Sequence, residues 1–126
     1  MAHYIDGFIL PVSRNHIDEY KSLVEAVAAI WLEHGALAYR EYIGDDLNLD
    51  GTRSFKDLTA ATSDEVVVFG WVEFESRAAR DVVNGKVATD SRVTRLVEAS
   101  SSGFDAARMA YGGFRSMVQH SGSTAS

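Results

Sequence analysis

The sequence contains no cysteine and a single proline among 126 residues. Without thiols it can form no disulfide, thiol nucleophile or zinc-thiolate site, a composition typical of the reducing cytoplasm. Basic residues are also scarce: 12 Lys and Arg stand against 18 Asp and Glu, which gives a net charge of −6. Because nucleic acids and anionic membranes are bound by clustered positive charge, we expect neither as a partner.

Long apolar runs are missing as well. No segment approaches the roughly 20 apolar residues that a membrane-spanning helix needs. The N-terminal stretch has no basic region before its apolar residues, so we expect no signal peptide and a cytoplasmic location. Hydrophobic residues still make up 46% of the chain, enough for the core of one domain. We assign that domain to residues 1–118 and expect a disordered tail over residues 119–126.

The most informative stretch is a predicted strand over residues 65–75, EVVVFGWVEFE. Its alternate side chains form two sets, and both are apolar for most of their length. A strand with one wet face alternates apolar and polar residues, so this strand must be covered on both sides.

The periodicity elsewhere predicts three more strands and two main helices, followed by a short helix that Asp90 caps. The strands are expected over residues 3–12, 36–43 and 108–118, and the helices over residues 16–34 and 77–88. This β-α-β-β-α-β order predicts a ferredoxin-like α+β fold with a four-stranded antiparallel sheet. The helices can cover only one face of the sheet. The simplest cover for the other face is a second copy, so we predict a homodimer with a barrel-like core between two sheets.

Several short motifs extend over residues 3–116, and the most specific are YIDGF at residues 4–8 and RMAYGGF at residues 108–114. These motifs resemble the YbaA-like family of small bacterial proteins of unassigned function. This resemblance implies the dimeric α+β barrel superfamily and carries no established activity. The chain departs from the family pattern at Gly70 and Phe74, where the family has Ser and Trp. It also has Ser91 and Gly103 at positions where the family has proline.

Polar side chains interrupt the otherwise apolar predicted strands. Charged groups beside a core are costly unless they are paired, so they are expected at strand ends, at a dimer seam or in a cleft. A cleft would supply carboxylates for proton transfer and an arginine for an anion. The alternative is that Asp6, Glu73 and Arg108 form satisfied salt bridges at the rim of the sheet. The candidates are Asp6, Glu41, Trp71, Glu73, Arg108 and Tyr111.

The connection over residues 44–64 is longer than an ordinary loop, so it is functional, mobile or partly structured. We expect Phe55 and Leu58 to attach its middle to the domain. The connection also contains the D-x-N-x-D-G start of a calcium-loop pattern. The alternative is a solvated acidic loop rich in turn-forming residues. The candidate ligands are Asp46, Asn48, Asp50 and Asp57.

Two further features have competing explanations. Gly112 and Gly113 indicate either a bulge that bends the last strand or the close approach of a ligand or partner backbone. The four histidines are dispersed and none lies on the second predicted helix, so we expect no haem and assign no cofactor.

The function that these patterns favour is binding or transformation of a small molecule in a pocket between sheet and helices. Glu41 or Glu73 is the candidate catalytic base, Arg108 would hold an anionic group, and Asp6, Trp71 and Tyr111 would bind the ligand. Whether the protein is an enzyme stays open. The alternatives are a non-catalytic dimeric interaction module and an ion-binding protein that uses the acidic loop over residues 45–57.

Overall fold

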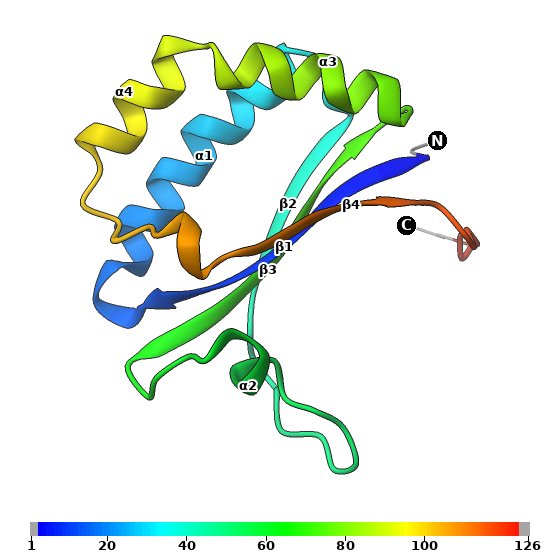
Figure 1. The fold of residues 1–126 in the computed structure, drawn as a ribbon. Coiled ribbons are helices and arrows are strands. Elements are labelled where there is room, and N and C mark those ends of the chain that lie inside the picture. Colours follow the sequence, from blue (N-terminus) through cyan, green and yellow to red (C-terminus); the bar gives the residue numbers. More distant parts are fainter. Residues whose placement is uncertain (1–2, 124–126) are drawn as a thin grey trace.

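The computed structural model describes residues 3–123, and the last residues of the predicted tail, 124–126, lie outside that range. The predicted α+β fold with its β-α-β-β-α-β order is confirmed (Figure 1). The main elements are β1 (Tyr4–Ser13), α1 (Ile17–Glu33), β2 (Ala38–Ile43), α2 (Phe55–Thr59), β3 (Glu65–Phe74), α3 (Arg77–Ala88), α4 (Ser91–Ala99) and β4 (Ala110–Arg115). Short 3₁₀ turns cover Arg14–His16 and Ala106–Arg108.

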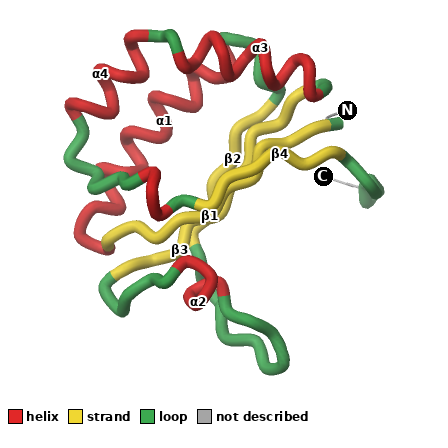
Figure 2. The backbone as a smooth tube through the Cα atoms, viewed as in Figure 1, coloured by secondary structure: helices red, strands yellow, loops and turns green. Residues whose placement is uncertain are grey.

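The sheet is antiparallel with strand order β2-β3-β1-β4. Directly opposed residues share a face of the sheet, so the pairing of Asp6 with Val72 places both on one face and that of Ile5 with Glu73 places both on the other. Helices α1, α3 and α4 cover the first face, which we call the helix side (Figure 2). The second face, which we call the open face, carries α2 and the connection around it, and the segment after β4 lies beside its Ile5–Glu73 end.

Local signals start and stop the helices where the sequence predicts. Ser13 accepts a hydrogen bond from the backbone of Asn15 and begins the 3₁₀ turn that leads into α1. Gly35 follows α1 with φ of 118°, a conformation that glycine adopts without strain. Ser76 and Asp90 cap α3 and α4 through their side chains. These caps fix the helix ends before any packing decides how the helices lie on the sheet.

The last strand differs from its predicted extent. It covers Ala110–Arg115 rather than residues 108–118, because Arg108 belongs to the preceding 3₁₀ turn. Of the two explanations for Gly112 and Gly113, the bulge is wrong, since the register between β1 and β4 is unbroken from Tyr4 to Ile9. Gly113 instead makes room for side chains: a Cβ there would lie 2.2 Å from the Tyr4 hydroxyl oxygen.

Two details of the packing concern α3 and β1. In α3, 56% of Val82 is exposed, while Val83 and Val87 are buried. In β1, pairing with β4 ends at Ile9, whereas pairing with β3 continues through Pro11 to Ser13. A residue without an N–H is tolerated there because β1 has only one neighbouring strand at that point.

The long connection is partly structured by α2, which packs on the open face. Phe55 stacks on Phe69 with ring centroids 6.1 Å apart, as the sequence led us to expect for this apolar residue. The chain after β4 has no helix or strand up to residue 123. Within residues 3–123, no helix is both long enough and apolar enough to cross a membrane.

Candidate functional site

A cavity of about 210 Å³ lies on the helix side, between α1, α4 and the sheet. Its walls are aliphatic and aromatic, and the segment that links α4 to β4 contributes Phe104 and Met109. The complete lining is Phe8, Tyr20, Leu23, Val24, Val27, Trp31, Tyr39, Val72, Val93, Val97, Phe104, Met109 and Tyr111. We call this space the inner cavity.

At the β2 end of the inner cavity, two tyrosine hydroxyls donate to one carboxylate. The Tyr20 hydroxyl lies 2.5 Å from one Glu41 oxygen, and the Tyr39 hydroxyl lies 2.8 Å from the other. Burial raises the pKa of Glu41, and the two phenol hydrogen bonds oppose that rise. Burial also raises the pKa of both tyrosines, and the charge of Glu41 raises it further. The arrangement therefore fixes two aromatic walls of the cavity through a shared acceptor.

At the β4 end, a second chain of hydrogen bonds surrounds Asp6, which is fully buried. The Tyr111 hydroxyl donates to Asp6 Oδ2 at 2.7 Å, and Asn84 Nδ2 donates to the same oxygen at 2.8 Å. Trp31 Nε1 donates in turn to Asn84 Oδ1 at 3.2 Å. Burial raises the pKa of Tyr111, so its hydroxyl stays protonated and continues to donate.

Arg80 supplies the positive charge that balances Asp6. Its Nε lies 3.6 Å from Asp6 Oδ1, too far for a hydrogen bond, and 3.3 Å from Asp81 Oδ1. Within residues 3–123, neither Arg80 Nε nor Asp6 Oδ1 has a hydrogen-bond partner, and both atoms are buried. Its Nη2 donates to the Tyr4 hydroxyl at 2.9 Å, and its guanidinium lies over the Tyr4 ring. Gly113, opposite Asp6 on β4, leaves the space that Tyr4 and Arg80 occupy.

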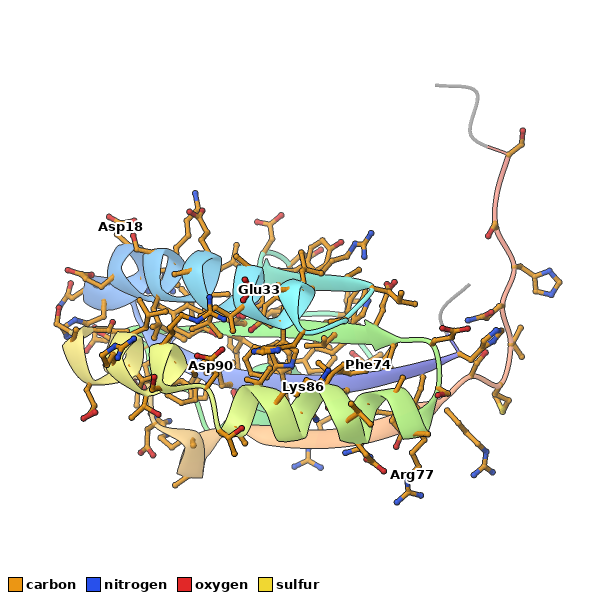
Figure 3. All side chains as sticks on the ribbon, turned by 90° about the horizontal axis from the view of Figure 1, so that it is seen from above. Asp18, Glu33, Phe74, Arg77, Lys86 and Asp90 are labelled. Carbon is orange, nitrogen blue, oxygen red and sulfur yellow. The ribbon has the colours of Figure 1, made fainter. Side chains whose placement is uncertain are left out.

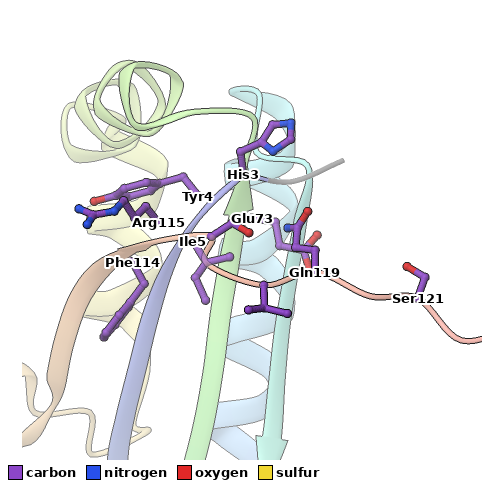
Figure 4. Close-up of a pocket in the computed structure, with 10 residues that line it drawn as sticks. His3, Tyr4, Ile5, Glu73, Phe114, Arg115, Gln119 and Ser121 are labelled. Carbon is purple, nitrogen blue, oxygen red and sulfur yellow. The ribbon is translucent and has the colours of Figure 1, made fainter.

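The structure divides the candidate residues that the sequence grouped together. Asp6, Glu41 and Tyr111 lie on the helix side, next to the inner cavity. Trp71 and Glu73 lie on the open face, where Trp71 Nε1 donates to Glu73 at 2.9 Å. Arg40 pairs with the same carboxylate at 3.1 Å. A hollow at that end of the sheet has Glu73 beside Ile5 (Figure 4).

Arg108 is also apart from the inner cavity. It pairs with Glu65 and donates to the carbonyl oxygen of Ala60 at 3.2 Å. The alternative interpretation of satisfied salt bridges therefore describes Arg108 and Glu73, whereas it does not describe Glu41.

Sequence reasoning missed several members of the site. Tyr20 and Trp31 belonged to the apolar stripe of α1, and nothing in that stripe indicated hydrogen bonds to Glu41 or Asn84. Arg80 and Asn84 lie one turn apart on α3 and both reach Asp6. Two polar residues spaced by four on the inward face of a helix were the available signal.

The acidic connection does not form a ligand cluster. In the part of the chain that the structure describes, the only close group of three potential metal ligands is Glu33, His34 and Asp90. Arg92 already pairs with Glu33 and Asp90, and His34 Nε2 lies 2.8 Å from Asp90 Oδ2. Figure 3 shows Glu33 on α1 and Asp90 at the start of the neighbouring helix α4. These residues join the two helices through a network of charges.

Comparison with known proteins places the chain in a family. Residues 3–106 match the family described as protein of unknown function (DUF1428). The chain is 35% identical over 115 residues to the uncharacterized protein YbaA of Escherichia coli strain K12. The aligned region covers 91% of this chain and 97% of YbaA. YbaA of Shigella flexneri matches with the same identity and coverage. The chain belongs to this family, and the resemblance carried by its motifs is confirmed.

Among solved structures, the chain is similar to SnoaB, a cofactor-independent oxygenase from Streptomyces nogalater. The TM-score is 0.50 and the sequence identity 11%, over 94% of this chain and 97% of SnoaB. At this identity the likeness concerns the fold alone, and it agrees with the α+β superfamily that the sequence motifs implied.

Proposed function

We propose that this member of the DUF1428 family binds a small, apolar, ring-containing molecule in the inner cavity and can transform it by proton transfer. The observation that carries the proposal is the cavity itself. Pockets for small molecules are mostly apolar and contain a few placed polar groups. Here aliphatic and aromatic walls include three tyrosines, Tyr20, Tyr39 and Tyr111, whose hydroxyls donate to two carboxylates.

The volume limits the size of the ligand. An engineered apolar cavity of about 150 Å³ holds benzene. At about 210 Å³, the inner cavity fits a molecule with one ring or two small fused rings. The rings of Phe8 and Tyr111, which stack with centroids 6.0 Å apart, offer an aromatic surface to such a molecule.

The Asp6–Tyr111 pair is the group best placed for proton transfer. The Tyr111 ring lines the cavity, and its hydroxyl donates to the buried carboxylate of Asp6, which lies 3.6 Å from Arg80 Nε. Glu41 reaches the cavity through Tyr20 and Tyr39 in the same way. Of the two bases suggested by the sequence, Glu41 keeps this role in the proposal. Glu73 does not, because it lies on the open face. SnoaB, a cofactor-independent oxygenase of the same fold, gives an analogy for chemistry without a cofactor.

The proposal includes a homodimer formed through the open face. This face carries large exposed apolar side chains: Tyr42 is 53% exposed, Phe69 46% and Phe114 59%. The rings of Tyr42 and Trp71 stack at 5.4 Å, and Trp71 continues to Phe69 at 5.9 Å. A second copy would bury this aromatic surface, and the Arg40–Glu73 pair beside it would give the contact a preferred orientation.

The test is a binding titration with a fluorescent two-ring probe, 2-naphthol, together with native mass spectrometry of the protein purified from cells. In Val93→Trp, an indole fills part of the inner cavity, and we expect probe binding to fall at least about tenfold. The control is Val82→Trp on the exposed face of α3, which should bind as the wild type does. Circular dichroism checks that both variants fold.

Equal binding by Val93→Trp and the wild type would reject the cavity as the ligand site. A retained small molecule in the native mass spectrum would support the proposal and identify the ligand class. To test proton transfer, Tyr111→Phe should bind the probe with little change but lose any turnover of the identified ligand. Unchanged turnover in Tyr111→Phe would remove the Asp6–Tyr111 pair from the mechanism.

A further inference from the structure

A second pocket lies on the outer side of the same tyrosine pair, between α1 and the edge strand β2. We call it the β2 groove, and its volume is about 480 Å³. Tyr20, Val24 and Tyr39 belong to both spaces, so the two tyrosine rings separate the groove from the inner cavity. Ile17 and Ile43 add aliphatic surface to the groove. The walls can therefore hold the apolar body of a ligand.

Glu41 lines this groove, and its electrostatic situation differs from that of the other half-buried or buried carboxylates. Asp6 faces Arg80, Glu65 faces Arg108 and Glu73 faces Arg40. For Glu41, the interactions found within residues 3–123 are two phenol hydrogen bonds and no ion pair.

The position of Glu41 leaves capacity for a further donor. A carboxylate has about four acceptor positions, and the hydroxyls of Tyr20 and Tyr39 use one on each oxygen. Lys21 also lines the groove, but its ammonium pairs with Glu25 at 3.9 Å, and both of these side chains are more than two-thirds exposed. The two phenols hold the carboxylate in one orientation, and its remaining acceptor positions can receive a cationic group of a ligand.

We propose that the β2 groove binds a small organic amine, with its ammonium group on Glu41 and its apolar body against α1 and β2. A carboxylate that is partly removed from water without a cation is unfavourable, and an ammonium group in the groove restores the missing charge. The aliphatic and tyrosine walls exclude water from the ion pair and strengthen it. The negative charge of Glu41 disfavours carboxylate ligands, so the groove discriminates between ligands by the sign of their charge.

This proposal does not depend on the inner cavity. The groove opens on the other side of Tyr20 and Tyr39, and its ligand differs in charge from the neutral ring-containing molecule proposed for the cavity. Either site can be removed by substitution while the other is retained.

The experiment compares two ligands of nearly equal shape, phenethylamine and 2-phenylethanol, by calorimetry and by amide chemical-shift titration at pH 7. The wild type should bind the amine about tenfold or more tightly than the alcohol, because hydrogen bonds to charged groups are the stronger ones. Shifts should be largest around Tyr20, Tyr39 and Ile43. In Glu41→Gln the preference for the amine should disappear, since the amide retains an acceptor but has no charge.

Glu75→Gln is the matched control, because it removes one carboxylate at an exposed position outside the groove and should keep the amine preference. Ala28→Trp fills the groove while leaving Glu41 in place, so it should abolish amine binding and serves if Glu41→Gln does not fold. Val93→Trp, which blocks the inner cavity, should leave amine binding unchanged. Equal affinity for the two ligands, binding of neither, or a preference that persists in Glu41→Gln would each overturn the proposal.

Discussion

Two glycines of the sheet keep space for groups that pass close to the backbone. A Cβ on Gly70 would lie 2.4 Å from the carbonyl oxygen of Arg40 and 2.8 Å from the ring of Phe8. A Cβ on Gly113 would overlap the Tyr4 hydroxyl and lie 2.9 Å from Arg80. Both glycines are on the helix side. The packing around Phe8 and Asp6 therefore requires that these two positions have no side chain.

Alanine substitutions at two glycines should have opposite effects on stability. Gly70→Ala forces a shift of the β2 backbone, and we expect it to destabilise by about 1–3 kcal/mol, the range for overpacking. Gly85→Ala, in α3 with no atom near the new methyl group, should stabilise by roughly 0.5–1 kcal/mol through helix propensity. Urea unfolding measures both. A Gly70→Ala variant as stable as the wild type would contradict the close packing between β2 and β3.

The Arg108–Glu65 pair predicts a pH dependence at the acidic end. Hydrogen bonds from Arg108 and the Thr62 backbone lower the pKa of Glu65 from 4.5 to about 2. Because the folded-state pKa is depressed, the stabilisation is complete above pH 4.5 and is lost as the pH falls toward 2. The melting temperature of Glu65→Gln should therefore fall less than that of the wild type over this range. Glu25→Gln, at an exposed pair, should follow the wild type; identical slopes for all three proteins would disprove the assignment.

At the level of elements, α4 is the least firmly packed part of the helix layer. None of its residues is fully buried, yet Val93 and Val97 form part of the wall of the inner cavity. Its start is attached to the end of α1 through Asp90, which accepts one hydrogen bond from the Arg92 backbone and lies 2.8 Å from His34 Nε2. The attachment of α4 therefore depends on polar contacts at one end more than on burial.

Loss of the Asp90 side chain should cost more than loss of an ordinary helix cap. Ser76→Ala removes one cap hydrogen bond from α3 and should cost about 1 kcal/mol. Asp90→Ala removes the cap of α4 together with the contacts to His34 and Arg92, so we expect a larger loss of stability. Hydrogen exchange should also show faster opening of α4 than of α1 in this variant. Equal losses in the two variants would mean that the contacts of Asp90 with His34 and with the Arg92 side chain contribute nothing.

For the whole molecule, the two faces of the sheet have different roles. The helix side is closed by α1, α3 and α4 and contains both proposed ligand sites. The open face has aromatic side chains in contact with one another and is covered by α2 only around Phe55. Sequence alternation had left both faces of β3 equally apolar. The helices occupy one face, so only the open face is available to a second copy.

A charge on the open face should dissociate the proposed dimer. We expect the wild type to be a dimer at micromolar concentration by light scattering, and Phe69→Glu to be a monomer because it would bury an unpaired carboxylate. Val82→Glu, which places the same charge on the exposed side of α3, should remain a dimer. A monomeric wild type, or a dimeric Phe69→Glu, would exclude this interface.

The sequence by itself determined the order of the four strands and the main helices, the ends of α1 and α3 to within a residue, and the alternation of strand residues between the two faces. These features depend on local physics: the two-residue period of strands, helix caps such as Asp90, and the left-handed conformation of Gly35. Alternation alone places Asp6 and Ile5 on opposite faces of the sheet, and likewise Trp71 and Val72.

Only the tertiary structure decided which polar groups meet. The partners Asp6 and Asn84, or Tyr20 and Glu41, are far apart in the chain, and their contact depends on strand register and on the rotation of each helix over the sheet. Val83 is buried and its neighbour Val82 is exposed, a difference of one residue step around the axis of α3. The sequence pattern allowed either residue to face inward. Local periodicity specifies a face, whereas a hydrogen bond requires position to within a fraction of an ångström, which packing alone supplies.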